Sequence, residues 1–346
     1  MRAFPHGTDD TRTLYAGSVL VGEDLEQTTF KLIASSVVPG WTNARVILAE
    51  KETRISNLTF DGSRADFDRD AISWYSTSLV QLQFADDSVV EYLRVHDGYG
   101  QKDYRLFKES FGVNVVSSST VIVRQIEAFD MDGSGVAVAG HLYRKRPSNA
   151  LIENVLAYNN RAQGVSFYVV DNSVARNLIT YNTRRGINIA YGNNILIENA
   201  ETYSNEWFGV GIGGMNSGIG LRNITSWNNG TDTGYAGATE IAILAGIWHT
   251  EPAQDSTAYA AGILTDITVE NLTLTPREGR PHVVITTTLD EWELEKLWIT
   301  DRFPGKMNIQ SPGSEAWIYR LDGVDVPATQ LHSYVVTTYG IVLKPQ

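Results

Sequence analysis

A phrase of about 22 residues repeats through the middle of this chain, and this repeat limits the folds that the chain can adopt. Within each copy, apolar and β-branched residues alternate with polar ones, so the copies predict strands rather than helices. Repeats of this length, made of short strands and polar turns, are typical of a solenoid. The copies begin at Leu151, Val174, Ile195 and Gly220.

Three residue types recur in register with the phrase. We expect the asparagines to form an amide ladder inside the turns, the aromatic residues to stack, and the glycines to permit a positive φ or a close turn. The asparagines are Asn154, Asn177, Asn199 and Asn223. The aromatic residues are Tyr158, Tyr181, Tyr203 and Trp227. The glycines are Gly112, Gly135, Gly164, Gly186 and Gly209.

The predicted fold class is therefore all-β, a right-handed parallel β-helix of the pectate-lyase-like kind with about 10–12 rungs. A solenoid can absorb the whole length of 346 residues as one domain. Within residues 1–346 we expect an N-terminal cap segment over 1–35, rungs over 36–310, and terminal rungs or a cap over 311–346.

Composition excludes several classes of function. With 28 basic and 40 acidic residues the formal charge is -12, so a nucleic-acid partner is not expected. The chain has no cysteine, which excludes disulfides and thiolate chemistry, and no apolar run near 18 residues that would predict a membrane span. The first residues lack the sections of a signal peptide, and we expect an extracellular or virion-associated protein without a cofactor.

Two N-terminal segments carry a resemblance to known proteins. They are VLVGEDLEQTTFKL, from Val19, and ISNLTFDGSR, from Ile55. Together with the repeats, over residues 17–230, they resemble the start of carbohydrate-active right-handed β-helices. The most similar groups are the catalytic modules of alginate (mannuronan) C5-epimerases and the phage tailspike-type depolymerases. The resemblance implies a polysaccharide substrate and, for a tailspike, a homotrimer.

One motif departs from the epimerase pattern. That group carries Tyr-Gly-Phe-Asp-Pro-His on one early rung, and the best-aligned segment here is Phe111–Val116. Phe111, Asn114 and Val116 stand where the group has tyrosine, aspartate and histidine. Because none of the three side chains transfers protons, the sequence predicts that this chain is not an epimerase of that type.

Strand alternation predicts a binding face. Counting from each repeated glycine, positions +1 and +3 are apolar and point inward, so +2 and +4 point outward. Two insertions, residues 98–110 and 141–149, are expected to wall this face into a cleft for an extended glycan. The predicted substrate-binding residues are Asn114, Arg144, Ser166, Arg185 and Asn188.

The leading hypothesis is β-elimination on an acidic, uronate-containing polysaccharide. The basic residues His141, Arg144, Lys145, Arg146, Arg161, Arg184 and Arg185 are expected to converge and to attract a polyanion. Elimination needs a group that neutralises the carboxylate, a base and an acid. Arg185 or Arg144, with Asn188, fits the first role. The predicted catalytic residues are His141, Tyr168, Tyr143 and Lys145.

Two other functions stay open. One is glycoside hydrolysis by a carboxylate pair, for which Asp130 and Asp132 are the candidates and Asp97 is the equivalent of Asp130 one rung earlier. The other is a non-catalytic glycan-binding or virion structural β-helix. Alternating carboxylates could also bind Ca²⁺, but their spacing fits no known loop, so no metal site is assigned. These carboxylates are Asp66, Asp68 and Asp70.

Overall fold

The structure is a computed structural model. It describes residues 12–32, 43–66, 76–100, 110–140, 146–213, 216–232, 238–244, 264–286, 309–310, 318–321, 324–327 and 330. Internal contacts divide the chain into two compact units, Met1–Thr183 and Arg184–Gln346. In both units the chain alternates between two parallel sheets, here called sheet A and sheet B. The prediction of one domain over 1–346 stays a prediction.

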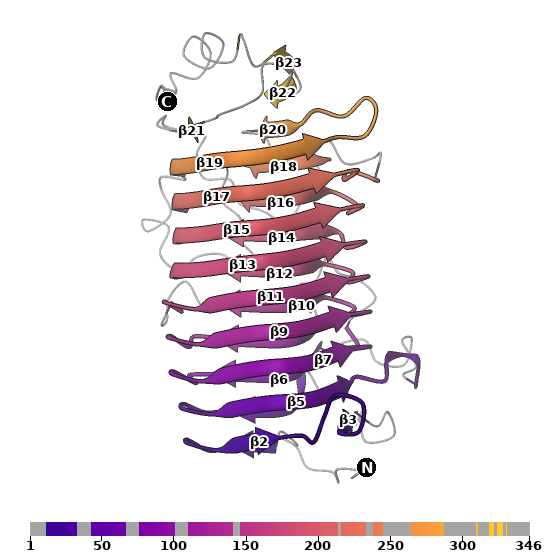
Figure 1. Cartoon of the computed structure of the whole chain (residues 1–346), viewed down its shortest axis with the longest axis vertical. Helices are drawn as coiled ribbons and strands as arrows, with labels where there is room; N and C mark the ends of the chain where they lie inside the picture. Colours follow the sequence, from indigo (N-terminus) through magenta and orange to yellow (C-terminus); the bar gives the residue numbers. More distant parts are fainter. Residues whose placement is uncertain are drawn as a thin grey trace. The chain divides into compact units, whose positions relative to one another are not determined.

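The first unit stacks its strands in sequence order, every second strand in the same sheet (Figure 1). Sheet A contains β1 (Arg12–Leu14), β4 (Asn43–Ala49), β6 (Ser76–Gln83), β8 (Phe111–Val116), β10 (Ser134–Ala139) and β12 (Gln163–Tyr168). Sheet B contains β2 (Val19–Val21), β5 (Arg54–Asp61), β7 (Val89–His96), β9 (Ile122–Phe129), β11 (Leu151–Tyr158) and β13 (Asp171–Tyr181). The short β3 (Thr29–Lys31) also pairs with β5, and a 3-10 turn, η2, spans Arg64–Asp66.

The second unit continues the same alternation. Its sheet A strands are β14 (Arg185–Ala190), β16 (Phe208–Gly213), β18 (Thr239–Leu244), β20 (Val283–Thr286) and β22 (Ile318–Leu321). Its sheet B strands are β15 (Asn193–Tyr203), β17 (Asn216–Trp227), β19 (Leu264–Thr275) and β21 (Ile309–Gln310). The last strand, β23 (Val324–Pro327), pairs antiparallel with β22, which covers the edge that a parallel stack would leave open.

These pairings confirm the predicted parallel β-helix. Within the described ranges the first unit contains six rungs and the second contains four with strands in both sheets, at the lower limit of the expected number. The first rung starts with β1, inside the segment 1–35 that was expected to be a cap. None of the described helical segments is long and apolar enough to cross a membrane.

The core lies between the two sheets and follows the predicted alternation. Val113, Val136 and Val165 form one inward column across β8, β10 and β12, and all three are fully buried. Each buried side chain of this size contributes roughly 1.5–3 kcal/mol. Gly112 precedes this column, and a Cβ there would lie 2.6 Å from both the Gly135 carbonyl oxygen and Val95 Cγ2. Close approach of the backbone, not a positive φ, requires this glycine.

A column of left-handed residues interrupts sheet B in the middle of its strands. In the first unit it contains Asn57, Tyr92, Gln125, Asn154 and Asn177, with φ between 53° and 57°. Asparagine tolerates this conformation better than most residues. Asn177 Nδ2 donates to Asn154 Oδ1 at 3.0 Å, so the repeated asparagines do form a ladder. The ladder is exposed, however, and the prediction that it lies inside the turns is wrong.

A second left-handed residue follows the last residue of the sheet B strand. Where the residue directly after it is an asparagine, that residue buries its side-chain amide. Asn160 Nδ2 donates to the Ala128 carbonyl oxygen at 3.0 Å, and Asn160 Oδ1 accepts from the Met131 N–H at 3.1 Å. In the second unit, Asn205 Nδ2 donates to Asn229 Oδ1 at 2.8 Å. The Asn160 side chain thus satisfies backbone groups that the corner would otherwise bury without partners, whereas the Asn205 amide bonds to another buried side chain.

The aromatic column stacks as predicted within each unit. The rings of His96, Phe129, Tyr158 and Tyr181 follow one another with centroids 5.0 Å apart, and Tyr203 and Trp227 stack at 4.4 Å. Because the ring faces contact each other, they are not available to stack on sugars. The column therefore stabilises the rungs.

The outer face of sheet B carries a column of alternating charge. In the first unit the residues in register are Glu91, Arg124, Glu153 and Arg176. Arg124 Nη2 lies 2.6 Å from Glu91 Oε2, and Arg176 Nη2 lies 2.7 Å from Glu153 Oε2. Burial alone raises the pKa of Glu91, but hydrogen bonds from Arg124 and Arg54 outweigh burial, and the net pKa is lowered. Each charge is thus paired with the next rung.

Candidate functional site

Part of the predicted catalytic set lies outside the described residues. His141, Tyr143, Arg144 and Lys145 belong to residues 141–145, and Asp68 and Asp70 of the possible Ca²⁺ set belong to residues 67–75. Asp66 is the last residue of η2. The roles assigned to these side chains stay predictions.

Three predicted residues lie on the outer face of sheet A in the first unit. Asn114 on β8, Ala137 on β10 and Ser166 on β12 are in register, and Tyr168 follows two positions after Ser166. Asn114 and Ser166 are buried, and Tyr168 is half-buried. Burial raises the pKa of Tyr168 to about 12, so its hydroxyl stays protonated at neutral pH. In that state Tyr168 can donate a hydrogen bond but is a poor base.

Two predicted substrate-binding residues, Arg185 and Asn188, lie on β14 in the second unit. The Arg185 guanidinium carbon lies 4.6 Å from the centre of the Trp207 ring, at cation–π distance. Arg184 contacts the same ring at 5.1 Å, and its Nε lies 3.5 Å from Glu206 Oε2. In the first unit, Arg146 Nη2 pairs with Asp171 Oδ1 at 2.9 Å. These described arginines of the expected basic patch thus contact other protein groups.

The alternative acid pair, Asp130 and Asp132, makes two different sets of contacts. Asp130 lies near Tyr158, whose pKa is raised to about 12 mainly by burial, with smaller contributions from Glu127 and Asp130. Asp132 is buried, and its Oδ1 lies 3.4 Å from Arg64 Nη1 while its Oδ2 accepts from the Gly100 N–H at 3.3 Å. The described contacts of Asp132 therefore lead to Arg64 rather than to Asp130.

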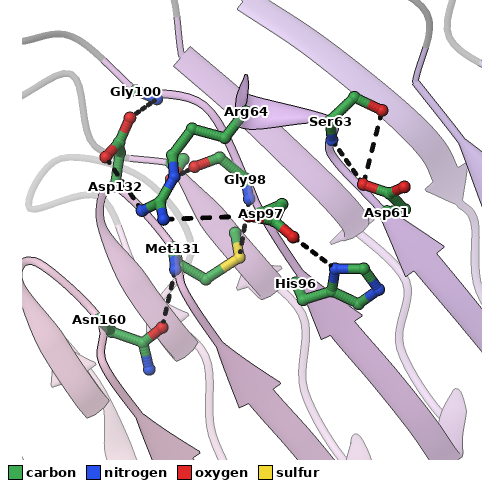
Figure 2. A network of polar contacts seen from close by, with 11 residues as sticks. Asp61, Ser63, Arg64, His96, Asp97, Gly98, Gly100, Met131, Asp132 and Asn160 are labelled. Atoms are coloured by element: carbon green, nitrogen blue, oxygen red, sulfur yellow. Dashed lines mark hydrogen bonds and ion pairs between the residues drawn. The ribbon is translucent and has the colours of Figure 1, made fainter. Parts of the chain in front are cut away.

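Figure 2 shows the group that forms around Arg64, which we name the corner cluster: Asp61, Arg64, His96, Asp97 and Asp132. His96 Nδ1 lies 2.8 Å from Asp97 Oδ2, and Arg64 Nη2 lies 3.9 Å from Asp97 Oδ1. Asp61 Oδ1 accepts from the Ser63 N–H at 2.7 Å. One oxygen of Asp61, one of Asp97 and one ring nitrogen of His96 all lie within 4.8 Å of one another.

The cluster forms where sheet B strands end and the chain turns toward sheet A. Asp61 ends β5 and His96 ends β7, in paired positions. Asp97 follows with φ 54°, and Asp130 and Asn159 hold the same left-handed position on later rungs. Asparagine at Asn159 meets the conformational need of this turn without a charge. The charge of Asp97 is thus not required by the backbone.

Sequence reasoning missed Asp61 and His96. A signal was present in the three Asp-Gly pairs that begin at Asp61, Asp97 and Asp132, each of which ends a rung phrase. The His96 ring also stands in the aromatic column, where it stacks on Phe129 with an interplanar angle of 12°. This stacking fixes the orientation of the imidazole beside Asp97.

The corner cluster can support two kinds of chemistry. Carboxylates and an imidazole at these separations can exchange protons with a substrate. Asp61, His96 and Asp97 also offer the donor set that divalent transition metals prefer, one imidazole nitrogen and two carboxylate oxygens. The cluster is accessible, because the side chains of Asp61 and Asp97 are 19% and 36% exposed.

Comparison with known proteins gives structural likenesses only. The chain matches no protein-family model, and it matches no curated protein sequence. Its structure is similar to two A-modules of mannuronan C-5 epimerases from Azotobacter vinelandii. AlgE4 is 17% identical, with 79% of each chain covered and a TM-score of 0.45; AlgE6 is 15% identical, with 96% of this chain and 85% of that chain covered and a TM-score of 0.47.

The Dettilon tailspike protein is also similar, at 13% identity over 87% of this chain and 60% of that chain, with a TM-score of 0.43. Both groups that the sequence resembles are thus found among the similar structures. All three identities are below 25% and all three TM-scores are below 0.5. The fold therefore rests on the strand pairing, and the chemistry rests on the residues of this chain.

Proposed function

We propose that the protein cleaves polysaccharides, and that it does so by hydrolysing a glycosidic bond at the corner cluster. The observation that carries this proposal is the approach of Asp61 and Asp97, whose carboxylate oxygens lie within 4.8 Å of each other. Retaining glycosidases place their two carboxyl groups about 5–5.5 Å apart, whereas inverting enzymes separate them by roughly 6.5–9.5 Å. The short separation favours retention of the anomeric configuration.

In this mechanism one carboxylate attacks the anomeric carbon while the other carboxylic acid protonates the leaving oxygen. Water then cleaves the glycosyl–enzyme bond after the second group has taken its proton. We assign the attack to Asp97, which lies between the Arg64 guanidinium and the His96 imidazole. Asp61 then has the acid–base role.

Local charge favours hydrolysis over the β-elimination expected from the sequence. Among the described residues around the cluster, the carboxylates of Asp61, Asp97 and Asp132 outnumber the cations of Arg64 and Lys31. A negative corner repels a polyuronate and accepts a neutral glycan. Elimination on a uronate-containing glycan is the second candidate. It is supported by the His96–Asp97 contact, which orients an imidazole as a general base would be oriented.

The test incubates the full chain with a panel of neutral glucans and mannans and with alginate, pectate and bacterial capsules. New reducing ends without ultraviolet absorbance support hydrolysis, whereas unsaturated uronate products support elimination. Binding without any product would contradict both and would favour a non-catalytic glycan-binding or virion structural protein. NMR of the first product tests retention.

Two matched variants locate the reaction. Asp97→Asn is expected to lower kcat/KM by roughly 10²–10⁴-fold, the usual contribution of a positioned acid–base group. Asp130→Asn makes the same chemical change at the equivalent left-handed position one rung later, and activity is expected to persist. If Asp130→Asn loses activity and Asp97→Asn keeps it, the reaction is assigned to the Asp130 and Asp132 pair instead. An extracellular or virion-associated location and a homotrimer stay predictions, the latter tested by sedimentation.

A further inference from the structure

We propose that the outer face of sheet A in the first unit is a subsite for the hydroxyl groups of an uncharged sugar residue. This inference rests on the proposed function, because it places part of the same glycan beside the corner cluster. It assigns the substrate class, a neutral rather than a uronate-containing polysaccharide.

The face carries a row of polar side chains, which we name the amide row and which contains two hydrogen-bonded groups: Arg45 with Gln81 and Gln83, and Ser78 with Asn114. Arg45 Nε donates to Gln81 Oε1 at 2.9 Å, and Gln81 Nε2 donates to Gln83 Oε1 at 3.0 Å. The row comes from three neighbouring strands, β4, β6 and β8, which are paired in parallel. Mutual hydrogen bonds hold these amides in fixed orientations.

Asn114 is the incomplete member of the row. Its Nδ2 donates to Ser78 Oγ at 3.5 Å, but its Oδ1 is buried and has no hydrogen-bond partner. The residue is only 7% exposed, so solvent reaches little of it. A buried polar atom without a partner costs about 1–3 kcal/mol, and native proteins tolerate few such atoms. A bound group that donates a hydrogen bond would remove this cost.

The chemistry of the open position selects the ligand. An amide oxygen is an acceptor, so it needs a donor such as a sugar hydroxyl. A uronate carboxylate offers only acceptor oxygens, and it would face Asn114 Oδ1 without a hydrogen bond. Asp or His at this position would present a charge, but Asn114 presents none. The row contains one charged residue, Arg45, whose Nε already donates to Gln81.

The subsite lies within reach of the corner cluster along one glycan. Phe111, the first residue of β8, pairs with Ser134, which comes two residues after Asp132. Asn114 lies three residues further along β8, about 10 Å at the usual rise of a strand. An extended oligosaccharide can therefore contact the amide row while one of its glycosidic bonds lies at the corner.

The experiment measures binding to the full chain carrying Asp97→Asn, so that ligands are held without being cleaved. The probes are neutral gluco- and manno-hexasaccharides, together with hexagalacturonate and hexamannuronate, titrated by calorimetry. Asn114→Leu removes the amide at similar volume and is expected to weaken binding of the best neutral probe roughly tenfold, the value of one buried hydrogen bond. Gln83→Met, at the half-buried end of the row, is expected to weaken it by a smaller factor.

Thr225→Val is the matched control, because it removes a polar group from the exposed outer face of sheet B in the second unit without changing shape. Its binding is expected to equal that of the parent. Thermal melts establish that each variant is folded, and if Asn114→Leu does not fold, Gln83→Met decides.

Tighter binding of the hexauronates, equal binding by all variants, or no binding of any probe would overturn the inference. Equal binding by all variants would leave the proposed hydrolysis intact if the wild type still forms products. In the converse result, binding of a neutral probe depends on Asn114 but the wild type forms no product. That result would support the subsite and contradict the proposed hydrolysis.

Discussion

The corners that follow sheet B share a backbone in the two units but differ in chemistry. In the first unit the left-handed position holds Asp97 and Asp130 on its earlier rungs, with φ 54° and 52°, and Asn159 and Asn182 on its later ones. In the second unit it holds Ser204 and Asn228, with φ 54° and 56°. The residues after Ser204 and Asn228, Asn205 and Asn229, bury their amides in the corner.

The difference shows which residue properties the turn requires and which it does not. Both corners need a residue that accepts a left-handed backbone and side chains that satisfy the buried peptide groups. Neither need includes a net charge. The carboxylates of the first corner, and the imidazole in its aromatic column, are therefore free to serve chemistry, whereas the second corner is organised for stability.

The largest expected effect, a loss of activity, comes from replacing the charged and titratable side chains of the first corner by uncharged ones. The double variant His96→Phe, Asp97→Asn introduces the residue types that this chain has at the equivalent positions of later rungs. These are the phenylalanine of Phe129, one rung later, and the asparagine of Asn159, two rungs later. We expect kcat/KM to fall by roughly 10²–10⁴-fold. The free energy of unfolding should change by less than about 1 kcal/mol, since the turn keeps its preferred residue types. Kinetics and urea unfolding of the same sample measure both quantities. Full activity in this variant would show that the charged side chains of the first corner do not take part in the reaction.

Removing a buried amide should cost more stability in the second corner than in the first. Asn229→Leu removes the hydrogen bonds of Asn229 with the Glu240 carboxylate, the Thr202 carbonyl oxygen and the Asn205 amide, and we expect a loss of about 3–5 kcal/mol. Asn160→Leu in the first unit removes only the contacts with Met131 and Ala128. There we expect about 2 kcal/mol. Urea midpoints compare the two, and equal losses would show that the corners do not differ in stability.

A buried carboxylate gives the second corner a pH dependence. Burial raises the pKa of Glu240 above its ordinary 4.5, although hydrogen bonds from Ser226 and Asn229 oppose the shift. The folded state then binds the proton more tightly than the unfolded state. This stabilisation is full below about pH 4.5 and is lost as the pH rises through the raised pKa.

Glu240→Gln tests that dependence, because the amide cannot ionise. Thermal melts of the wild type and of the variant over this pH range should differ in slope, and the variant should have the flatter profile. Parallel profiles would show that Glu240 titrates with the same pKa in the folded and unfolded states.

The smallest effect is expected from the reverse exchange. Asn228→Asp places a carboxylate at the exposed left-handed position of the second corner, next to the Ser204 hydroxyl that Asn228 Nδ2 now contacts at 3.2 Å. The hydroxyl can donate to the new carboxylate, so we expect a change below about 0.5 kcal/mol. A clearly larger loss, seen in the urea midpoint, would mean that charge is tolerated only in the first corner.

Much of the fold was predictable because period-2 alternation is a local signal. It placed Val113 and Val136 inside, and the 23-residue spacing placed Tyr158 under Tyr181. The position of the amide ladder was not predictable, because left-handed residues break the alternation. A repeated asparagine such as Asn154 then points out of the sheet, while Asn160 on the same rung is buried.

The corner cluster was harder to predict than the fold. Asp61 and His96 are register partners but stand 35 residues apart, far from the period of about 22 in the middle of the chain. Insertions lengthen this rung, so a search for the regular repeat does not align the two side chains. Asn114 and Ser166 could be placed on one face because each of their rungs contains the repeated glycine. Inward and outward positions are counted from this glycine.

The charge column on sheet B fixes the order of charges over four rungs of the first unit, from β7 to β13. Glutamate and arginine alternate from Glu91 through Arg124 and Glu153 to Arg176, so equivalent charges recur only at every second rung. Deleting or duplicating a single rung would oppose two like charges across a strand pair, which is destabilising. Two-rung blocks keep the alternation. A solenoid of this kind can therefore be lengthened or shortened most easily by even numbers of coils, both in evolution and in engineering.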